Sequence, residues 1–193
     1  TKHDMGQDDN LNASLAHIVL GCVASRGISR MSGKSFIHPG MHANFFVHSI
    51  LGFLHYQSGI FNNDFGPAYK ISYQASKYLA LPCLNADLYS GNQNLSLLHL
   101  ASGVIPFAMA LGGNENEALG NMMIAVNIIS LCHYSMEHNN EWGWYTAAGG
   151  LFAYFMTPQM GPKVMYPLGI ALMEYCAYRL FHRVYDPPPP PRR

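Results

Sequence analysis

An internal repeat constrains the fold of this chain more than any other feature of its sequence. The stretch 10–23, N-L-N-A-S-L-A-H-I-V-L-G-C-V, returns as 92–105, N-Q-N-L-S-L-L-H-L-A-S-G-V-I, with identical residues at one offset (96 − 14 = 82). A fixed period of this kind indicates a duplicated structural unit. The identical pairs are Asn10/Asn92, Asn12/Asn94, Ser14/Ser96, Leu15/Leu97, His17/His99 and Gly21/Gly103.

A second match follows the first in the same order. The segments L-H-Y at 54–56 and N-N-D-F-G at 62–66 correspond to C-H-Y at 132–134 and N-N-E-W-G at 139–143. Their offsets (133 − 55 = 78 and 139 − 62 = 77) differ from the first by only a few residues, which places the length differences in loops. Two matches in one order favour a duplication of the whole unit.

The repeat predicts a single domain, 1–193, that consists of two related halves. The first half comprises 10–83 and the second 92–158. A helix at 163–182 has no counterpart in the repeat, and the chain ends in a proline-rich tail at 186–193, whose five consecutive prolines favour polyproline II or disorder.

The low content of charged residues indicates a membrane protein. Only 11% of the residues are Asp, Glu, Lys or Arg, compared with about 25% in soluble domains. Windows without charge recur at the spacing that a bilayer requires, so we expect contacts with lipid. The alternative is a soluble, histidine-rich helical domain with a large partner-facing surface. A mean hydropathy of only +0.03 favours that alternative.

Charge balance, cysteine spacing and motif content argue against several functional classes. Lys and Arg (11) balance Asp and Glu (11), so the basic footprint of a nucleic-acid-binding protein is missing. The four cysteines include no CxxC pair, which argues against a zinc site and a disulfide framework. No G-x-S-x-G, H-E-x-x-H or phosphate-loop motif occurs. We therefore expect no nucleic-acid partner and no catalytic residues.

Apolar windows and the Pro, Gly and Asn residues that flank them predict seven helices and no strand. The segment 25–40 is expected to form a basic loop, and 85–93 a polar link between the two halves. The predicted helices lie at about 14–24 (with an extension towards residue 30), 41–61, 67–81, 95–111, 117–136, 142–156 and 164–181.

The distribution of charge predicts the orientation of these helices in a bilayer. Basic residues at 26–34 and 179–193 are expected on the inner side, and acidic residues at 4–9 and 115–117 on the outer side. If three helices of each half span the bilayer, the second half lies upside down relative to the first, as in transporter folds. The predicted fold class is an all-α polytopic membrane bundle of six or seven helices, with two inverted three-helix repeats plus one C-terminal helix.

Repeated polar residues in each half are predicted to act as structural clamps. Side chains of Ser and Asn satisfy backbone N–H groups at helix starts, and His, Ser and Asn bind neighbouring helices within membranes. His17 and His99 are each expected to clamp the facing turn of their own half. The other clamp residues are Asn12, Ser14, Asn94 and Ser96 at helix starts, and Asn62, Asn63, Asn139 and Asn140 in the facing turns.

The repeated histidines also allow a cofactor hypothesis. In the predicted topology, His17 and His55 approach the outer face, and His99 and His133 approach the inner face. Imidazole is a good ligand for haem iron and for transition metals. Two bis-His haem b groups at these pairs would resemble the ligand arrangement in cytochrome b561-type proteins; the resemblance covers no sequence motif. A proton or substrate path is the third interpretation of these residues.

Two further observations concern polar residues outside the repeat. His42, His48 and His55 follow one another at intervals of six and seven along the second predicted helix, near one face. Glu174 is the carboxylate that lies well inside a late apolar window, where it is expected to pair with Arg179 or with a neighbouring helix. A transport role for Glu174 is the alternative.

Three classes of function follow from these features. The first is a non-catalytic structural or accessory subunit of a larger membrane complex, with other membrane subunits as partners. An energy-transducing complex of an organelle, in the mitochondrial inner membrane, is the host that we favour. The second class is a membrane redox protein with haem or metal at the histidine pairs. The third is a small-substrate carrier or channel that uses the pseudo-symmetry of the repeat.

Overall fold

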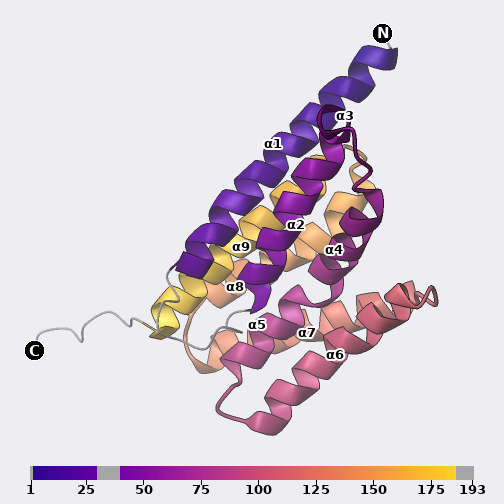
Figure 1. The fold of residues 1–193 in the computed structure, drawn as a ribbon. Coiled ribbons are helices and arrows are strands. Elements are labelled where there is room, and N and C mark those ends of the chain that lie inside the picture. The colour runs from indigo at the N-terminus through magenta and orange to yellow at the C-terminus, as the bar shows by residue number, and fades with distance from the viewer. Residues whose placement is uncertain (1, 30–39, 186–193) are drawn as a thin grey trace, which may run out of the picture.

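The computed structural model of the protein describes residues 2–29 and 40–185, and these residues form helices and short connections without any strand (Figure 1). The prediction of an all-helical chain is therefore confirmed for this part of the sequence. The α-helices are α1 (Lys2–Ser29), α2 (Gly40–Tyr56), α3 (Ser58–Phe61), α4 (Gly66–Tyr78), α5 (Ala80–Leu88), α6 (Gln93–Leu111), α7 (Glu117–Glu137), α8 (Glu141–Leu151) and α9 (Met165–Tyr185). A π-helical turn, η1 (Phe152–Met156), and a 3-10 turn, η2 (Thr157–Gln159), follow α8.

The helices form two groups that are joined through α5. In Figure 1, α1, α2 and α9 run side by side, and α4 and α8 pack against this group. The helices α6 and α7 run together along the lower right of the molecule, where α5 contacts both of them. The core includes Leu20, Phe45, Tyr78, Leu81 and Met173, which come from α1, α2, α4, α5 and α9.

Small residues allow α1 and α2 to approach closely. A side chain at Gly52 would overlap the His17 ring, one at Gly21 would contact Ser49, and one at Gly27 would overlap His42. These three contacts run in opposite directions along the two helices, so α1 and α2 are antiparallel. Close contacts through glycine are typical of helices that pack within membranes.

Three helices in the described ranges are long and apolar enough to cross a bilayer: Asn10–Ser29, Gln93–Leu111 and Glu117–Glu137. They belong to α1, α6 and α7, and they indicate a membrane protein. For the other helices, and for the inverted relation of the two halves, spanning of the bilayer stays a prediction.

Several predicted boundaries are wrong. Residues 25–29 continue α1 instead of forming a loop, while 30–39 and the tail 186–193 lie outside the described residues. The predicted helix 67–81 breaks at Leu79, and α5 occupies part of the predicted link 85–93. The break has a local cause: Pro82 has no N–H to donate to the carbonyl oxygen of Tyr78, and its ring crowds that oxygen.

The ends of two other predicted helices also differ from the structure. The predicted helix 41–61 ends at Tyr56, and the chain turns before the short helix α3. The predicted helix 142–156 changes to a π-helical turn after Leu151, shortly before Pro158. After Leu151 the apolar pattern continues while the backbone changes, so the pattern alone hides that boundary.

Candidate functional site

Three histidines of α1 and α2 surround one tyrosine of α4. The ring of Tyr69 stacks on His55 with a centroid distance of 4.5 Å and an interplanar angle of 7°. Its centroid lies 5.4 Å from that of His48 and 5.9 Å from that of His17. These four residues form the Tyr69 cluster, the first of two histidine clusters in the molecule.

Hydrogen bonds fix the tautomers of two rings in the Tyr69 cluster. The Nδ1 atom of His17 lies 2.8 Å from the carbonyl oxygen of Ala13, which only accepts, so Nδ1 carries the proton. The Nδ1 atom of His48 lies 2.9 Å from Ser72 Oγ, and that hydroxyl donates to the carbonyl oxygen of Tyr69, so Nδ1 of His48 donates as well. In the neutral form of both rings, Nε2 therefore carries a lone pair.

The remaining ring nitrogens of the Tyr69 cluster are unusual. His17 Nε2, His48 Nε2 and His55 Nδ1 are buried and have no hydrogen-bond partner among the described residues. Buried polar atoms are almost always hydrogen-bonded, and exceptions call for an explanation. The three exceptions around one phenol ring distinguish the Tyr69 cluster from the rest of the described interior.

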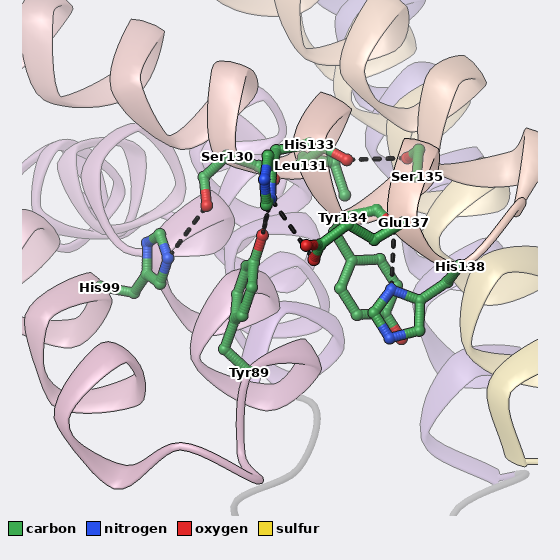
Figure 2. A network of polar contacts seen from close by, with 9 residues as sticks. All are labelled: Tyr89, His99, Ser130, Leu131, His133, Tyr134, Ser135, Glu137 and His138. Carbon is green, nitrogen blue, oxygen red and sulfur yellow. Dashed lines mark hydrogen bonds and ion pairs between the residues drawn. The ribbon is translucent and has the colours of Figure 1, made fainter.

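The second cluster contains the repeat-related histidine, His99 of α6. Its Nε2 lies 3.1 Å from Ser130 Oγ (Figure 2). Its Nδ1 donates to Asn127 Oδ1 at 2.9 Å, so both ring nitrogens are satisfied. Asn127 of α7 also accepts from Asn85 Nδ2 of α5 at 2.9 Å and donates to Ser102 Oγ at 2.8 Å. We call this group the Asn127 cluster; it joins α5, α6 and α7.

Tyr89 connects His99 to His133 at the edge of the Asn127 cluster. The Tyr89 ring stacks on His99 at 5.2 Å, and its hydroxyl donates to the carbonyl oxygen of Ser130 at 3.0 Å (Figure 2). The same hydroxyl lies 3.4 Å from His133 Nδ1. His133 itself is exposed and lies 3.5 Å from Glu137.

A third polar contact joins α2 and α9. His42 Nδ1 binds Glu174, and both side chains are fully buried. Glu174 thus pairs with a neighbouring helix, as one of the two sequence interpretations expects, while Arg179 lies over the Trp142 ring at 4.5 Å. The second carboxylate oxygen, Oε2 of Glu174, has no hydrogen-bond partner in the part of the chain that the structure describes.

The predicted histidine pairs are each brought together through a tyrosine. Tyr69 contacts His17 and His55, and Tyr89 contacts His99 and His133. In each pair a phenol ring lies against the face of one imidazole: Tyr69 stacks on His55 and Tyr89 stacks on His99. Within the described ranges, no group of three or more His, Cys, Asp and Glu residues is arranged to hold a metal ion. A bis-His haem needs only two histidines, so the haem hypothesis for these pairs stays a prediction.

The predicted helix caps of both repeats are wrong, but their serines do join helices. Asn12 and Ser14 lie inside α1, which begins far upstream of them, and Asn92 rather than Asn94 caps α6 by accepting from Leu95 N. Ser14 Oγ accepts a hydrogen bond from Gln57 Nε2 beyond α2 at 2.8 Å. In the second half, Ser96 Oγ donates to the carbonyl oxygen of Ala86 in α5 at 2.9 Å.

Two of the predicted turn asparagines adopt the same backbone conformation. Asn62 and Asn139, which the sequence pairs, have φ angles of 48° and 47°, in the left-handed region. Asparagine tolerates this conformation better than most residues with a side chain. Their neighbours differ: Asn140 is buried and caps α8 by accepting from Trp142 N at 3.2 Å, whereas Asn63 is exposed.

Sequence reasoning missed the residues at the centre of both clusters. Asn127 is an amide inside an otherwise apolar window, and intramembrane polar residues of this kind are a recognisable signal. Tyr69 and Tyr89 gave no signal, because tyrosine is common in this chain and its position relative to the histidines depends on how the helices pack.

Comparison with known proteins identifies a family but gives no activity. No curated protein sequence and no solved protein structure matches the chain. Residues 41–181 match a domain of unknown function, DUF4791, and this segment covers more than half of the chain and includes both clusters apart from His17. The chain therefore belongs to the DUF4791 family.

Proposed function

We propose that the protein is a multi-pass membrane protein that serves as a non-catalytic accessory subunit of a larger membrane complex. The surface of α6 carries this proposal. Only His99, Gly103, Pro106 and Ala110 of this helix are buried. Most of its large apolar side chains are exposed, and Leu98 is 64% exposed; Phe107 instead packs partly against the core.

The surface of α7 supports the same conclusion. It presents Met122, Val126, Ile129 and Met136 outward, and Ile129 is 67% exposed. Soluble monomers rarely expose apolar patches of this extent. Both helices are candidate spans, so lipid or other membrane helices are the surroundings that fit these faces.

The short helices favour a complex over a lone protein in lipid. The 13 residues of α4 reach about 20 Å at 1.5 Å per residue, and α5 has only 9 residues; a hydrocarbon core is about 30 Å thick. Lys70 on α4 is exposed. Backbone ends and charges at membrane depth require shielding by protein, which neighbouring subunits supply. We propose an organellar energy-transducing complex, in the mitochondrial inner membrane, as the host.

The clamp role of the Asn127 cluster agrees with a structural subunit. Each polar atom of His99 is used to join α6 and α7, and none is left for a ligand. In contrast, the redox alternative requires haem at the histidine pairs. A visible absorption spectrum distinguishes the two: the accessory-subunit account predicts no Soret band in the purified protein.

Native electrophoresis of the tagged chain tests the proposal. Membranes are first washed with alkaline carbonate, which an integral membrane protein resists, and the chain is then extracted in mild detergent. Leu98→Asn places an amide on the outer face of α6, and we expect loss of the large assembly while the chain remains folded by circular dichroism. His133→Gln changes an exposed residue of the same half and serves as the matched control. Normal assembly of Leu98→Asn, or loss of an electron-transfer activity without loss of assembly, would contradict the proposal.

A further inference from the structure

Two arginines lie at one level, at the same end of the helical bundle. The guanidinium carbon of Arg26 in α1 lies 5.2 Å from the centroid of the Tyr178 ring. That of Arg179, the next residue along α9, lies 4.5 Å from the centroid of the Trp142 ring in α8. In Figure 1, α1 and α9 run side by side, and both end at the lower left. Arg26 and Arg179 therefore flank α9 at the end of the bundle where these two helices finish.

The exposed side chains of α9 change in character towards this end. Leu168 and Leu172 are exposed, exposed Tyr175 follows about one turn later, and exposed Arg179 follows about one turn after that. A bilayer presents acyl chains, then an interface in which tyrosine and tryptophan are enriched, and then the headgroups. The outward face of α9 has the same order.

The outward face of α1 repeats this order in the same direction. Leu15, Ile18 and Val19 are exposed, and exposed Arg26 follows about two turns later. Arg26 also lies near the end of Asn10–Ser29, a segment that is long and apolar enough to cross a bilayer. Long cationic side chains near the end of a span reach the interface with water. The sequence of α1 thus places Arg26 at the level of the headgroups.

The spacing along both helices matches one leaflet of a bilayer. Leu15 and Arg26 are 11 positions apart in the sequence, and so are Leu168 and Arg179. At 1.5 Å per residue this separation is about 16 Å, and half of a hydrocarbon core of about 30 Å is about 15 Å. The leucines therefore lie near the middle of the bilayer when the arginines lie at its headgroups.

The start of α8 adds aromatic side chains at the same level. Trp142 lies beneath the guanidinium of Arg179. Within one turn of it, Trp144 is 45% exposed and Tyr145 is 54% exposed. Exposed rings of these two residue types are enriched at the boundary between acyl chains and headgroups. Three helices thus agree on where the headgroup layer lies.

Both arginines have hydrogen-bond donors left for a ligand. The side chain of Arg179 has one polar contact in the described residues, to the Tyr175 hydroxyl at 3.5 Å, and that of Arg26 has no hydrogen-bond acceptor there. A guanidinium that lies over a ring keeps its in-plane N–H groups, and their planar fork matches the oxygens of a phosphate group. Each group is therefore held by a ring while its donors face outward.

The carboxylates of the α7–α8 turn have other partners. Glu141, at the start of α8, accepts a hydrogen bond from Arg183 at 2.9 Å. Glu137, at the end of α7, lies 3.5 Å from His133. Within the described ranges, neither carboxylate forms an ion pair with one of the two ring-stacked arginines. The charges of those arginines are therefore open to an external anion.

We propose that Arg26 and Arg179 bind the phosphate groups of anionic phospholipids, whose acyl chains lie along the exposed leucines of α1 and α9. This inference rests on the membrane location in the proposed function, and it adds the class of lipid that this end of the protein selects. Basic residues near a negatively charged leaflet are attracted to it. A zwitterionic phospholipid instead carries a cation that the arginines repel.

Quenching of tryptophan fluorescence tests this proposal on the full chain, because both tryptophans, Trp142 and Trp144, lie at this end. The chain is reconstituted in phosphatidylcholine vesicles in which the same minor fraction of lipid carries bromine on one acyl chain. The brominated lipid is either phosphatidylglycerol or phosphatidylcholine. We expect phosphatidylglycerol to quench as if it were enriched about fivefold or more around the tryptophans, since one basic residue near an anionic surface supplies a factor of about five.

Substitutions assign this preference to the two arginines. The double variant Arg26→Gln, Arg179→Gln should be quenched equally by the two lipids, and comparing both lipids within one variant cancels any change in the fluorescence of Trp142 itself. Lys163→Gln is the matched control, because it removes a cation that lies before the start of α9, at the opposite end of this helix. It should keep the wild-type preference.

The contradicting results separate this inference from the proposed function. A chain that floats with the vesicles on a density gradient, but is quenched equally by both lipids, overturns the inference and leaves the membrane location intact. A double variant that is folded by circular dichroism and keeps the wild-type preference overturns it as well. A chain that fails to float with the vesicles contradicts the membrane location itself, and the inference with it.

Discussion

His17 and His99 hold the same position in the two repeats, and both are buried, but they bind their surroundings differently. His99 uses both ring nitrogens to join α6 to α7 through Asn127 and Ser130. His17 uses one nitrogen to bind its own helix at Ala13, and its other nitrogen faces Gly52 of α2 without a hydrogen-bond partner in the described residues. We call His99, with both ring nitrogens hydrogen-bonded, the closed joint. We call His17, with one ring nitrogen lacking a partner in the described residues, the open base.

The same contrast extends to the neighbours of the two histidines. Around His99, hydroxyl and amide groups complete every hydrogen bond of the ring. Around His17, the neighbours are aromatic rings: His48, Tyr56 and Tyr69 lie within 5.9 Å of it between ring centroids. The two sequence-related histidines thus differ: His99 joins two helices, and His17 keeps one ring nitrogen without a hydrogen-bond partner in the described residues.

The repeated glycines show how the halves came to differ. Gly21 faces Ser49 of α2, within its own half, whereas Gly103 packs on Pro82 and on the carbonyl oxygen of Tyr78, at the junction of α4 and α5. The helix α5 is what changes the packing of α6. Because α5 lies beside α6, the segment 92–105 packs against helices of the first half. The segment 10–23 instead packs against α2 of its own half.

The largest effect is expected from Asn127→Leu, which breaks the closed joint at its centre. The substitution leaves the Nδ1 donor of His99 without an acceptor and removes the side-chain bonds to Asn85 and Ser102, while Asn85 keeps its bond to the backbone carbonyl oxygen of residue 127. Each stranded buried group costs about 1–3 kcal/mol, so we expect a loss of roughly 3 kcal/mol in the free energy of unfolding, measured by thermal or denaturant unfolding in detergent. Stability within a few tenths of the wild-type value would show that the Asn127 cluster is not a joint.

A slightly smaller effect is expected from Gly52→Ala in the open half. The added Cβ would overlap the His17 ring, so the ring or the helix must move. Overpacking of this kind costs about 1–3 kcal/mol. Gly59→Ala is the matched control, because no described atom lies within 4 Å of a Cβ there. Equal unfolding temperatures for the two variants would contradict the close packing of α1 on α2.

The histidines themselves sharpen the comparison. His99→Leu removes two hydrogen bonds between helices, and we expect a loss of about 2 kcal/mol. His17→Leu removes one hydrogen bond within α1 and also removes the buried ring nitrogen that lacks a partner in the described residues. The loss in the free energy of unfolding should therefore stay below about 1 kcal/mol. Unfolding of the two variants in one detergent measures the difference. A larger loss for His17→Leu would reverse the assignment of joint and base.

The smallest effect is expected at His133, which lies at the edge of the Asn127 cluster with 57% of its side chain exposed. Exposed substitutions usually change stability by about 0.5 kcal/mol or less. His133→Ala should therefore unfold with the wild type, although the sequence repeat pairs His133 with His55. A loss as large as that of His99→Leu would indicate that His133 contributes to the joint.

Local sequence patterns predicted most of the helices. The features that they missed depend on contacts between residues far apart in the sequence. The apolar window and its flanking Asn placed α6 and α7 to within two residues. The pair His42 and Glu174 was not specified by the sequence, because 132 residues separate its members and only the packing of α2 on α9 brings them together. The prediction that Asn12 and Ser14 cap the first helix is wrong for a simpler reason: α1 continues through the polar residues that look like its start.

The central claim, that this chain is an accessory subunit whose apolar faces are covered by other membrane proteins, has one direct test. The test is the native mass of the wild-type chain extracted from its own membrane in mild detergent. The account predicts a discrete particle far larger than the 21.4 kDa chain with its detergent, in which other membrane proteins are present in fixed ratio. A homogeneous monomer, free of other proteins and still folded, would contradict it.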